Sequence, residues 1–336
     1  MSLSRRECMA VALAPWVMPS LAQTPGARAA TGDVAVHHVG VLSLSRSASQ
    51  LAAYEGTGIR VALKAAGYEE GRNLKIAWRF AEADQARLAA LAQELVQENV
   101  ELILAITNEP IEAAMRVTQR IPIVMIGAAL PVELGYVQSL ARPGGNVTGT
   151  SWAGVEVSGK VLQTLREAVP SARRVTIVAA EQASGKAIYR AANLGTAKAL
   201  GIAVNIVYVA PGDTLASVLA RMAAGRPEAL FVAGEGVVGT MLAPIAAYAR
   251  QHKLVSIGVT PHHIQAGGAL YYGPNLEALM QRTASYIERI LKGARPADLP
   301  VELPTKFDLI VNQRALKAMG VVLPRSLLLR ADVVVE

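Results

Sequence analysis

The 336-residue chain has a single cysteine, few aromatic residues and no apolar run long enough to span a membrane. The one cysteine, Cys8, lies in an N-terminal segment that we expect to be removed, so the mature protein has no thiol. This excludes disulfides, thiol catalysis and cysteine-ligated zinc. The remaining residues, about 310 of them, bury a core large enough to do without disulfides even in an oxidising compartment.

The first 22 residues follow the order of a secretory signal peptide. Arg5 and Arg6 supply positive charge, an apolar stretch covers residues 8–18, and Ala22 closes an A-x-A-like cleavage site. The apolar stretch is only about half as long as a transmembrane helix, so we expect no stable membrane insertion. We expect export to the periplasm, by the general or the twin-arginine route, with residues 1–22 removed and residues 23–35 left as a flexible N-terminus.

The positive charge of the chain does not indicate a nucleic-acid partner. The formal net charge is +7, it is spread along the sequence without a Lys/Arg-rich run, and the aromatic residues that could stack on bases make up only 4% of the chain. We therefore expect no nucleic-acid binding, and we expect a monomer.

Short runs rich in Val and Ile alternate with helical patterns, which predicts an α/β fold built from βαβ units around buried parallel sheets. The expected strands cover residues 39–44, 74–80, 102–106 and 123–126, then 175–179, 204–209, 229–233 and 255–259. The tail adds a strand at 269–272, a helix at 276–291 capped by Asn275, and a strand at 307–311. So many strands favour two doubly wound, Rossmann-like lobes over one continuous sheet.

Three breaks in the pattern predict a three-segment hinge between the lobes. They are residues 143–146, the pair Gly273 and Pro274, and the pair Leu303 and Pro304. We expect one lobe to contain residues 36–149 plus 274–300, and the other to contain residues 150–272 plus 303–336. The crossovers would absorb the backbone rotation of lobe closure.

A G-x-G-x-x-G motif at residues 234–239 follows an expected strand, as in dinucleotide-binding proteins. The mechanism also needs an acidic residue about twenty positions further on to hold the ribose, and none occurs between Glu235 and Glu277. The histidines have no second ligand at metal-binding spacing, and the chain lacks a G-x-S-x-G elbow and a Walker lysine. We expect no cofactor, no metal and no catalytic residue.

Several longer motifs resemble one family. The most specific are AGYEEGRN at residues 66–73, SLARPGGNVTG at 139–149 and YGPNL at 272–276. With them the chain resembles, over residues 39–336, the ABC-transporter substrate-binding proteins related to the tryptophan- and tyrosine-uptake receptors. The resemblance implies a type I periplasmic binding protein fold, a solute in the cleft between two lobes, and delivery to an ABC permease with its cytoplasmic ATPase.

Two departures from the family pattern concern the ligand. Leu130-Pro131 stands where relatives often have Asp-Pro, and Ala180-Glu181 where they have Asn-Pro. We therefore do not carry tryptophan or tyrosine over, and expect a small organic solute that is amino-acid-like or is an aromatic or carboxylate compound. A sensory receptor that presents its ligand to a signalling ectodomain, and a periplasmic enzyme, are the alternative functions.

In open α/β sheets ligands bind beyond the carboxyl ends of the strands. The candidate ligand residues are therefore the strand-end residues Ser43, Ser45, Thr107, Asn108, Ala128, Ala129, Ser151, Ala180, Glu181, Glu235, Thr260 and Tyr272.

Two of these positions predict opposite charges on the ligand. Pro110 suits the first position of a helix, so free N–H groups and the Thr107 hydroxyl are expected to bind an anionic group, unless Asn108 simply caps the helix. Glu235, between two glycines, is expected to bind a donor or cationic group, with a solvated loop acid as the alternative.

Overall fold

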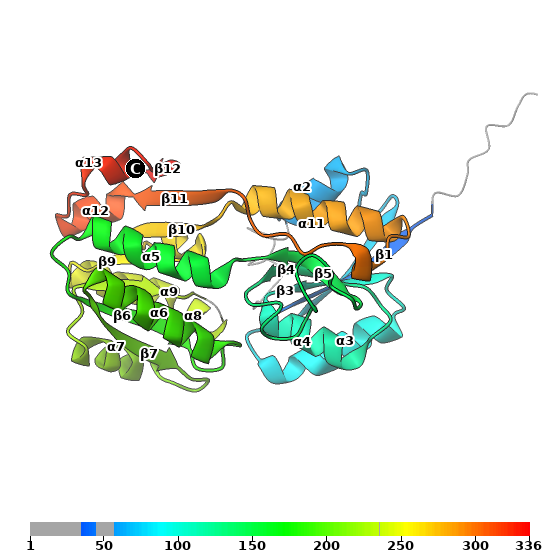
Figure 1. Ribbon diagram of the computed structural model, residues 1–336, viewed down its shortest axis with the longest axis horizontal. Coiled ribbons are helices and arrows are strands. Elements are labelled where there is room, and N and C mark those ends of the chain that lie inside the picture. Colours follow the sequence, from blue (N-terminus) through cyan, green and yellow to red (C-terminus); the bar gives the residue numbers. More distant parts are fainter. Residues whose placement is uncertain (1–34, 45–56, 235) are drawn as a thin grey trace, which may run out of the picture. The chain divides into compact units, whose positions relative to one another are not determined.

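The computed structural model describes residues 35–44, 57–234 and 236–336, and residues 35–336 belong to one compact unit. The first sheet contains parallel strands in the order β2-β1-β3-β4-β5 (Figure 1). Its elements along the chain are β1 (His37–Ser43), α2 (Thr57–Ala65), β2 (Leu74–Phe80), α3 (Leu88–Gln97), β3 (Leu102–Ile106), α4 (Asn108–Val117), β4 (Ile123–Ala128) and β5 (Val147–Ser151).

The second sheet has the order β12-β11-β10-β9-β8-β6-β7, with β11 antiparallel to β10 and the other pairs parallel. The strands of this sheet and the helices between them follow along the chain as α5 (Gly154–Ala168), β6 (Arg174–Ala180), α6 (Lys186–Leu200), β7 (Ala203–Val209), α7 (Leu215–Ala224), β8 (Ala229–Val232), α8 (Gly236–Gly239), α9 (Leu242–Gln251), β9 (Val255–Gly258), α10 (His262–Gln265) and β10 (Leu270–Pro274). After α11 (Leu276–Leu291) the chain completes it with β11 (Phe307–Asn312), α12 (Gln313–Met319), α13 (Arg325–Leu328) and β12 (Val333–Val335).

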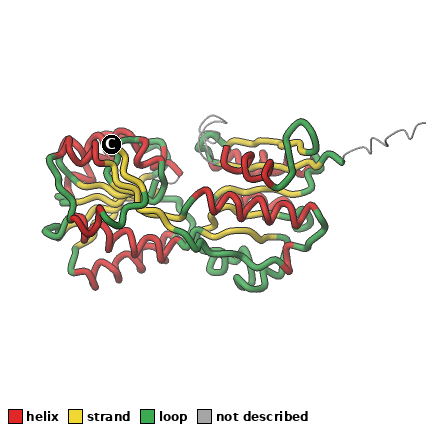
Figure 2. Tube along the Cα trace, turned by 90° about the horizontal axis from the view of Figure 1, so that it is seen from above, coloured by secondary structure: helices red, strands yellow, loops and turns green. Residues whose placement is uncertain are grey.

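In the buried strands, alternate side chains pack into separate hydrophobic cores on the two faces of each sheet. In β1, Val39 and Val41 pack with α2 and α11, whereas Leu42 packs with α3 and α4. In β6, Ile177 packs toward α5, whereas Val178 packs toward α7 and α9. Burial on both faces explains why the strands are nearly continuous apolar runs. Figure 2 shows the strands gathered in two groups with helices around each.

Helix α11 returns to the first sheet although it follows β10 of the second. Leu279 and Ile287 belong to the same buried cluster as Val39 and Val41. The side chain of Asn275 accepts a hydrogen bond from the N–H of Ala278 at 2.9 Å, so the expected cap is confirmed. The chain thus passes between the sheets three times, after β5, after β10 and before β11.

Strand β5 was not expected, because its sequence VTGTS is polar and rich in small residues. All of it is nevertheless buried, and its hydroxyls bond to backbone carbonyls: Thr148 to Leu299 at 2.6 Å and Ser151 to Ala128 at 2.8 Å. Gly149 has φ +131°, and a Cβ there would lie 2.4 Å from the carbonyl oxygen of Met125. The first sheet therefore extends to Ser151.

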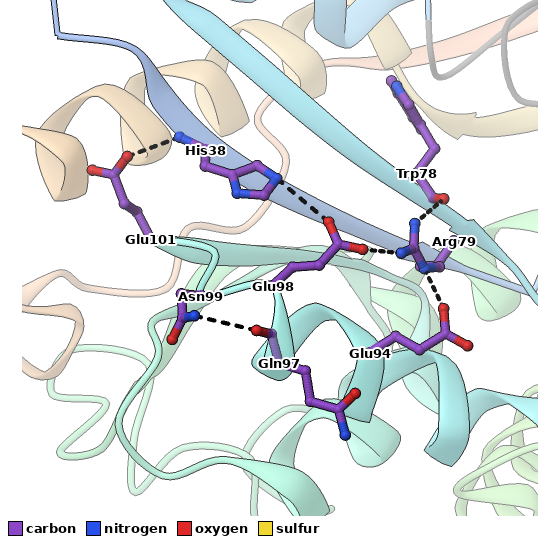
Figure 3. Close-up of polar contacts among 8 residues, drawn as sticks. All are labelled: His38, Trp78, Arg79, Glu94, Gln97, Glu98, Asn99 and Glu101. Carbon is purple, nitrogen blue, oxygen red and sulfur yellow. Dashed lines mark hydrogen bonds and ion pairs between the residues drawn. The ribbon is translucent and has the colours of Figure 1, made fainter.

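Ion pairs fasten α3 to the edge of the first sheet (Figure 3). Arg79 of β2 donates through Nε to Glu94 at 2.6 Å and through Nη2 to Glu98. The backbone N–H of His38 donates to Glu101 at 2.8 Å. These contacts hold α3 against β2 at the edge of the first sheet. Helix α3 contributes no residue to the pocket that is described in the next section. No helix among residues 57–234 and 236–336 is long and apolar enough to cross a membrane.

Candidate ligand-binding site

A pocket of about 850 Å³, including its open mouth, lies at the carboxyl ends of β6, β7 and β8 and continues between these strands and the helices α5 and α6. The lining comes from both sheets: Asn108, Glu109, Ala129 and Trp152 beside the first, and Gly154, Val157, Ser158, Ile177, Ala179, Ala180, Ala183, Ser184, Lys186, Tyr189, Arg190, Asn193, Ile206, Tyr208, Phe231, Ala233 and Val259 beside the second.

The charged groups of the pocket are opposite in sign on its two sides. Glu109 stands in the first turn of α4, where burial raises the pKa of its carboxyl and the nearby charge of Glu112 adds to that effect. Lys186 and Arg190 stand one turn apart on α6. The Lys186 ammonium lies 2.5 Å from a carboxylate oxygen of Glu181 and 5.1 Å from the ring centre of Tyr208. The pocket thus offers an acid opposite two cations.

The other walls are largely apolar and aromatic. Trp152 follows β5 directly, and its indole Nε1 is buried without a hydrogen-bond partner among the described residues. Tyr189 of α6 lies across the start of α5, where a Cβ on Gly154 would come within 1.7 Å of its phenol oxygen. Phe231 of β8 forms part of the floor. A ring or branched apolar group fits such walls.

The start of α4 differs from the expectation. The helix begins at Asn108, with Thr107 as its N-cap at φ +68°, so Pro110 is its third residue and not its first. The side chain of Asn108 does not cap the helix but accepts a hydrogen bond from the N–H of Ala129 at 2.9 Å. The Thr107 hydroxyl lies 3.5 Å from the Glu109 carboxylate. A partly buried acid therefore occupies the turn where an anion site was expected.

The structure brings only some of the predicted site residues together. Asn108, Ala129 and Ala180 line the pocket. Ser45 and Glu235 lie outside the described residues. The other predicted residues are at or near strand ends but do not line the pocket: Ser43, Thr107, Ala128, Ser151, Glu181, Thr260 and Tyr272. Among these, Tyr272 stacks on Phe307 with ring centres 5.9 Å apart, and Glu181 pairs with the pocket residue Lys186.

Sequence reasoning missed the lining residues contributed by helices, chiefly Tyr189, Arg190 and Asn193 of α6. Trp152 and Tyr208 had a usable signal, because each is a large aromatic residue at the end of a strand. For α6 no local signal exists, because its approach to the pocket depends on how the helix lies across the sheet. Among the described residues no group of three or more His, Cys, Asp or Glu side chains is placed to hold a metal ion.

Two parallel-dominated sheets with a pocket at their strand ends define a type I periplasmic binding protein, as the sequence predicted. A domain from Streptococcus pneumoniae in complex with L-Trp superposes with a TM-score of 0.81 at 22% identity, over 90% of this chain and 100% of that one. A ligand-free, open substrate-binding protein with adhesive properties from Clostridium difficile gives a TM-score of 0.66 at 26% identity, over 89% and 99% of the chains.

Sequence comparison is more specific. Residues 38–335 match the family model described as ABC transporter substrate binding protein, and the chain belongs to that family. It is also 26% identical over 263 residues to a tyrosine-binding protein of Clostridioides difficile, a match that covers 78% of this chain and 75% of the relative. The resemblance seen in the sequence motifs is therefore confirmed, and the family is one of binding proteins.

Proposed function

We propose that this chain is the extracytoplasmic solute receptor of an ABC importer and that it binds a small zwitterionic or aromatic carboxylate solute in the pocket described above. The observation that carries the proposal is the pocket lining, in which Glu109 of α4 and the cations Lys186 and Arg190 of α6 line one pocket together with apolar residues. The relatives named as tyrosine-binding and as bound to L-Trp support an amino-acid-like ligand. Their particular amino acids are not transferred to this chain.

In this proposal Glu109 accepts hydrogen bonds from the ligand's ammonium group, while Lys186 and Arg190 hold its carboxylate. Lys186 already pairs with Glu181, so its position is fixed before the ligand arrives. Ionised partners make the stronger hydrogen bonds in a site shielded from water. This polarity is the reverse of the one expected from residues 107–110 and Glu235.

We also propose that the two sheets are the two lobes, with boundaries close to residues 36–149 plus 274–300 and 150–272 plus 303–336. The three passages of the chain between the sheets support a hinge there. A ligand that touches both sides has contacts in the closed form that the open form lacks, and this difference in binding free energy drives closure. The same proposal includes presentation of the closed form to a permease and its ATPase, and a periplasmic location. It also includes a monomeric state and the absence of catalysis. These parts of the proposal rest on the family.

Native mass spectrometry of protein purified without refolding tests the proposal. We expect a bound solute that carries both a cationic or donor group and a carboxylate. Calorimetric titration with that solute should give one site per chain, and incubation should leave the solute chemically unchanged. A solute that is turned over, or one that lacks any anionic group, would overturn the assignment.

A further inference from the structure

The inner end of the pocket is polar although its walls are apolar. Val157 of α5, Ile177 of β6 and Phe231 of β8 line the pocket yet are only 2%, 1% and 2% exposed. The pocket therefore continues from its open mouth into the dry interior beside the second sheet. We call this part the inner chamber and define it by Val157, Ser158, Ile177, Asn193, Ile206 and Phe231.

Ser158 and Asn193 are the hydrogen-bonding side chains of this chamber. The Ser158 hydroxyl donates to Oδ1 of Asn193 at 2.6 Å, which joins α5 to α6. The two residues are 3% and 5% exposed. The bond uses the carbonyl of the Asn193 amide, and its Nδ2 has no hydrogen-bond partner among the residues that the structure describes.

An unpaired amide nitrogen in such a place points to a ligand. Nδ2 is not among the fully buried atoms without a partner, so it borders the open space of the pocket, where a ligand acceptor can reach it. A purely structural link between two helices has no need of asparagine, because a pair of apolar side chains would pack there without unpaired groups. The Asn193 side chain is fixed by Ser158, so its N–H groups are held in place at the wall of the chamber.

We propose that Asn193, oriented by Ser158, binds a hydrogen-bond acceptor at the far end of the ligand's apolar body. This inference rests on the proposed function and specifies the solute further: its charged head lies between Glu109 and Lys186, its ring or branched body lies in the inner chamber, and its tail ends in a hydroxyl, carbonyl, nitrile or similar acceptor. Ser158 is a positioning residue, and Asn193 determines specificity. Solutes that end in a bare ring leave the amide unpaired and bind more weakly.

Matched pairs of probes test this inference: L-phenylalanine with L-tyrosine, benzoate with 4-hydroxybenzoate, and 4-methylbenzoate with 4-cyanobenzoate. The members of each pair differ only at the end of the ring. We expect the wild-type protein to bind the acceptor-ended member of at least one pair tenfold or more tightly in calorimetric titration. Asn193→Leu should abolish this preference and leave the affinity for the bare-ring member unchanged or improved.

Two further variants keep the test decisive if Asn193→Leu folds poorly. Asn193→Asp keeps the shape but replaces the donor by an acceptor oxygen, so it should selectively weaken binding of 4-cyanobenzoate, whose nitrile can only accept, whereas the phenol hydroxyls of L-tyrosine and 4-hydroxybenzoate can still donate to the carboxylate. Ser158→Ala frees the amide to turn and should reduce the preference without removing it. Equal affinities within every pair in the wild type, or an unchanged preference for 4-cyanobenzoate over 4-methylbenzoate in Asn193→Asp, would overturn the inference. If no probe binds, the inference also fails, whereas the co-purified solute still decides the proposed function.

Discussion

The hydroxyl of Ser184 donates a hydrogen bond of 2.6 Å to Oε1 of Glu112, the oxygen to which Tyr136 also donates at 2.7 Å. Ser184 follows β6 of the second sheet, and Glu112 is on α4 beside the first. Burial, and the carboxylate that accepts its bond, raise the pKa of Tyr136, which keeps its proton and remains a donor. One carboxylate thus ties the two sheets together beside the pocket.

Ser184→Ala should speed ligand release without unfolding the protein. The lost bond is to a charged but partly exposed carboxylate, so we expect a loss of about 1 kcal/mol, or about a fivefold increase in the dissociation rate. Stopped-flow measurement with the co-purified solute checks this. The exposed Ser171 offers a control, since Ser171→Ala should leave the rate unchanged. An unaltered rate in Ser184→Ala would show that the bond does not hold the closed form.

Glu109→Gln should weaken ligand binding while it stabilises the empty protein. Burial raises the pKa of the Glu109 carboxyl, so the fold prefers the neutral form and loses stability as the pH rises through the ordinary value toward the raised one. Glutamine removes that penalty and also removes the charge that attracts the ligand's ammonium. We expect a higher melting temperature and at least a tenfold loss of affinity, about 1.4 kcal/mol.

The same group predicts how binding depends on pH. Affinity of the wild type should fall as the pH drops through the raised pKa of Glu109, because protonation removes the charge of the carboxylate, and Glu109→Gln should lack this component. Glu133→Gln, at an exposed position, serves as the control and should change neither quantity. Wild-type affinity that does not change with pH in the acid range would exclude a charged role for Glu109.

Gly154→Ala and Gly159→Ala form a matched pair on α5. A Cβ on Gly154 would collide with the Tyr189 phenol at 1.7 Å, whereas a Cβ on Gly159 would meet only Thr196 at 3.6 Å, an ordinary contact. We expect Gly154→Ala to displace Tyr189 from the pocket, to lower stability by about 1–3 kcal/mol and to weaken binding at least tenfold. Gly159→Ala should raise stability by about 0.5–1 kcal/mol through helix propensity. Urea denaturation and titration of both variants decide this, and comparable stabilities in the two would refute the clash.

His263 predicts a loss of stability in mild acid. It is fully buried, its Nε2 lies 3.0 Å from the hydroxyl of Ser256, and burial lowers its pKa to about 4. The unfolded chain binds a proton near pH 6.5, so the stabilising preference for neutral imidazole is complete above that pH and is lost as the pH falls toward 4. The loss is at most ~3 kcal/mol from this shift. His263→Gln should remove that component from the pH profile of unfolding, and His252→Gln, at an exposed position, should keep it. Parallel profiles of the wild type and His263→Gln would contradict the assignment.

Most of the secondary structure followed from local pattern. Three elements have the expected bounds: the strand Leu74–Phe80, the helix Lys186–Leu200 and the helix Leu276–Leu291. They could be predicted because the spacing of apolar residues and the capping residues are local features of the sequence. Strand β5 was missed, because its polar side chains are buried only through bonds to distant carbonyls. Nothing within five consecutive residues reveals such partners.

The site was less accessible to sequence reasoning. The strand-end rule found Asn108, Ala129 and Ala180, since that rule depends on topology alone. It could not find Glu109 as a pocket acid, because the backbone of Thr107 at φ +68° shifts the start of α4 and changes which side chains line the pocket. The α6 residues escaped for a related reason, since helix placement is a tertiary property.

The return of α11 to the first sheet also sets an order of events on the ribosome. Strands β1 to β5 leave the exit tunnel early together with α2, but part of the face that bears Val39 and Val41 is covered by Leu279, Met280 and Ile287 of α11. That part therefore stays open to water and to chaperones until synthesis has passed Leu291, after strands β6 to β10 are already available to pair. The part of the protein that is translated first thus waits for most of the second sheet before its own core is closed.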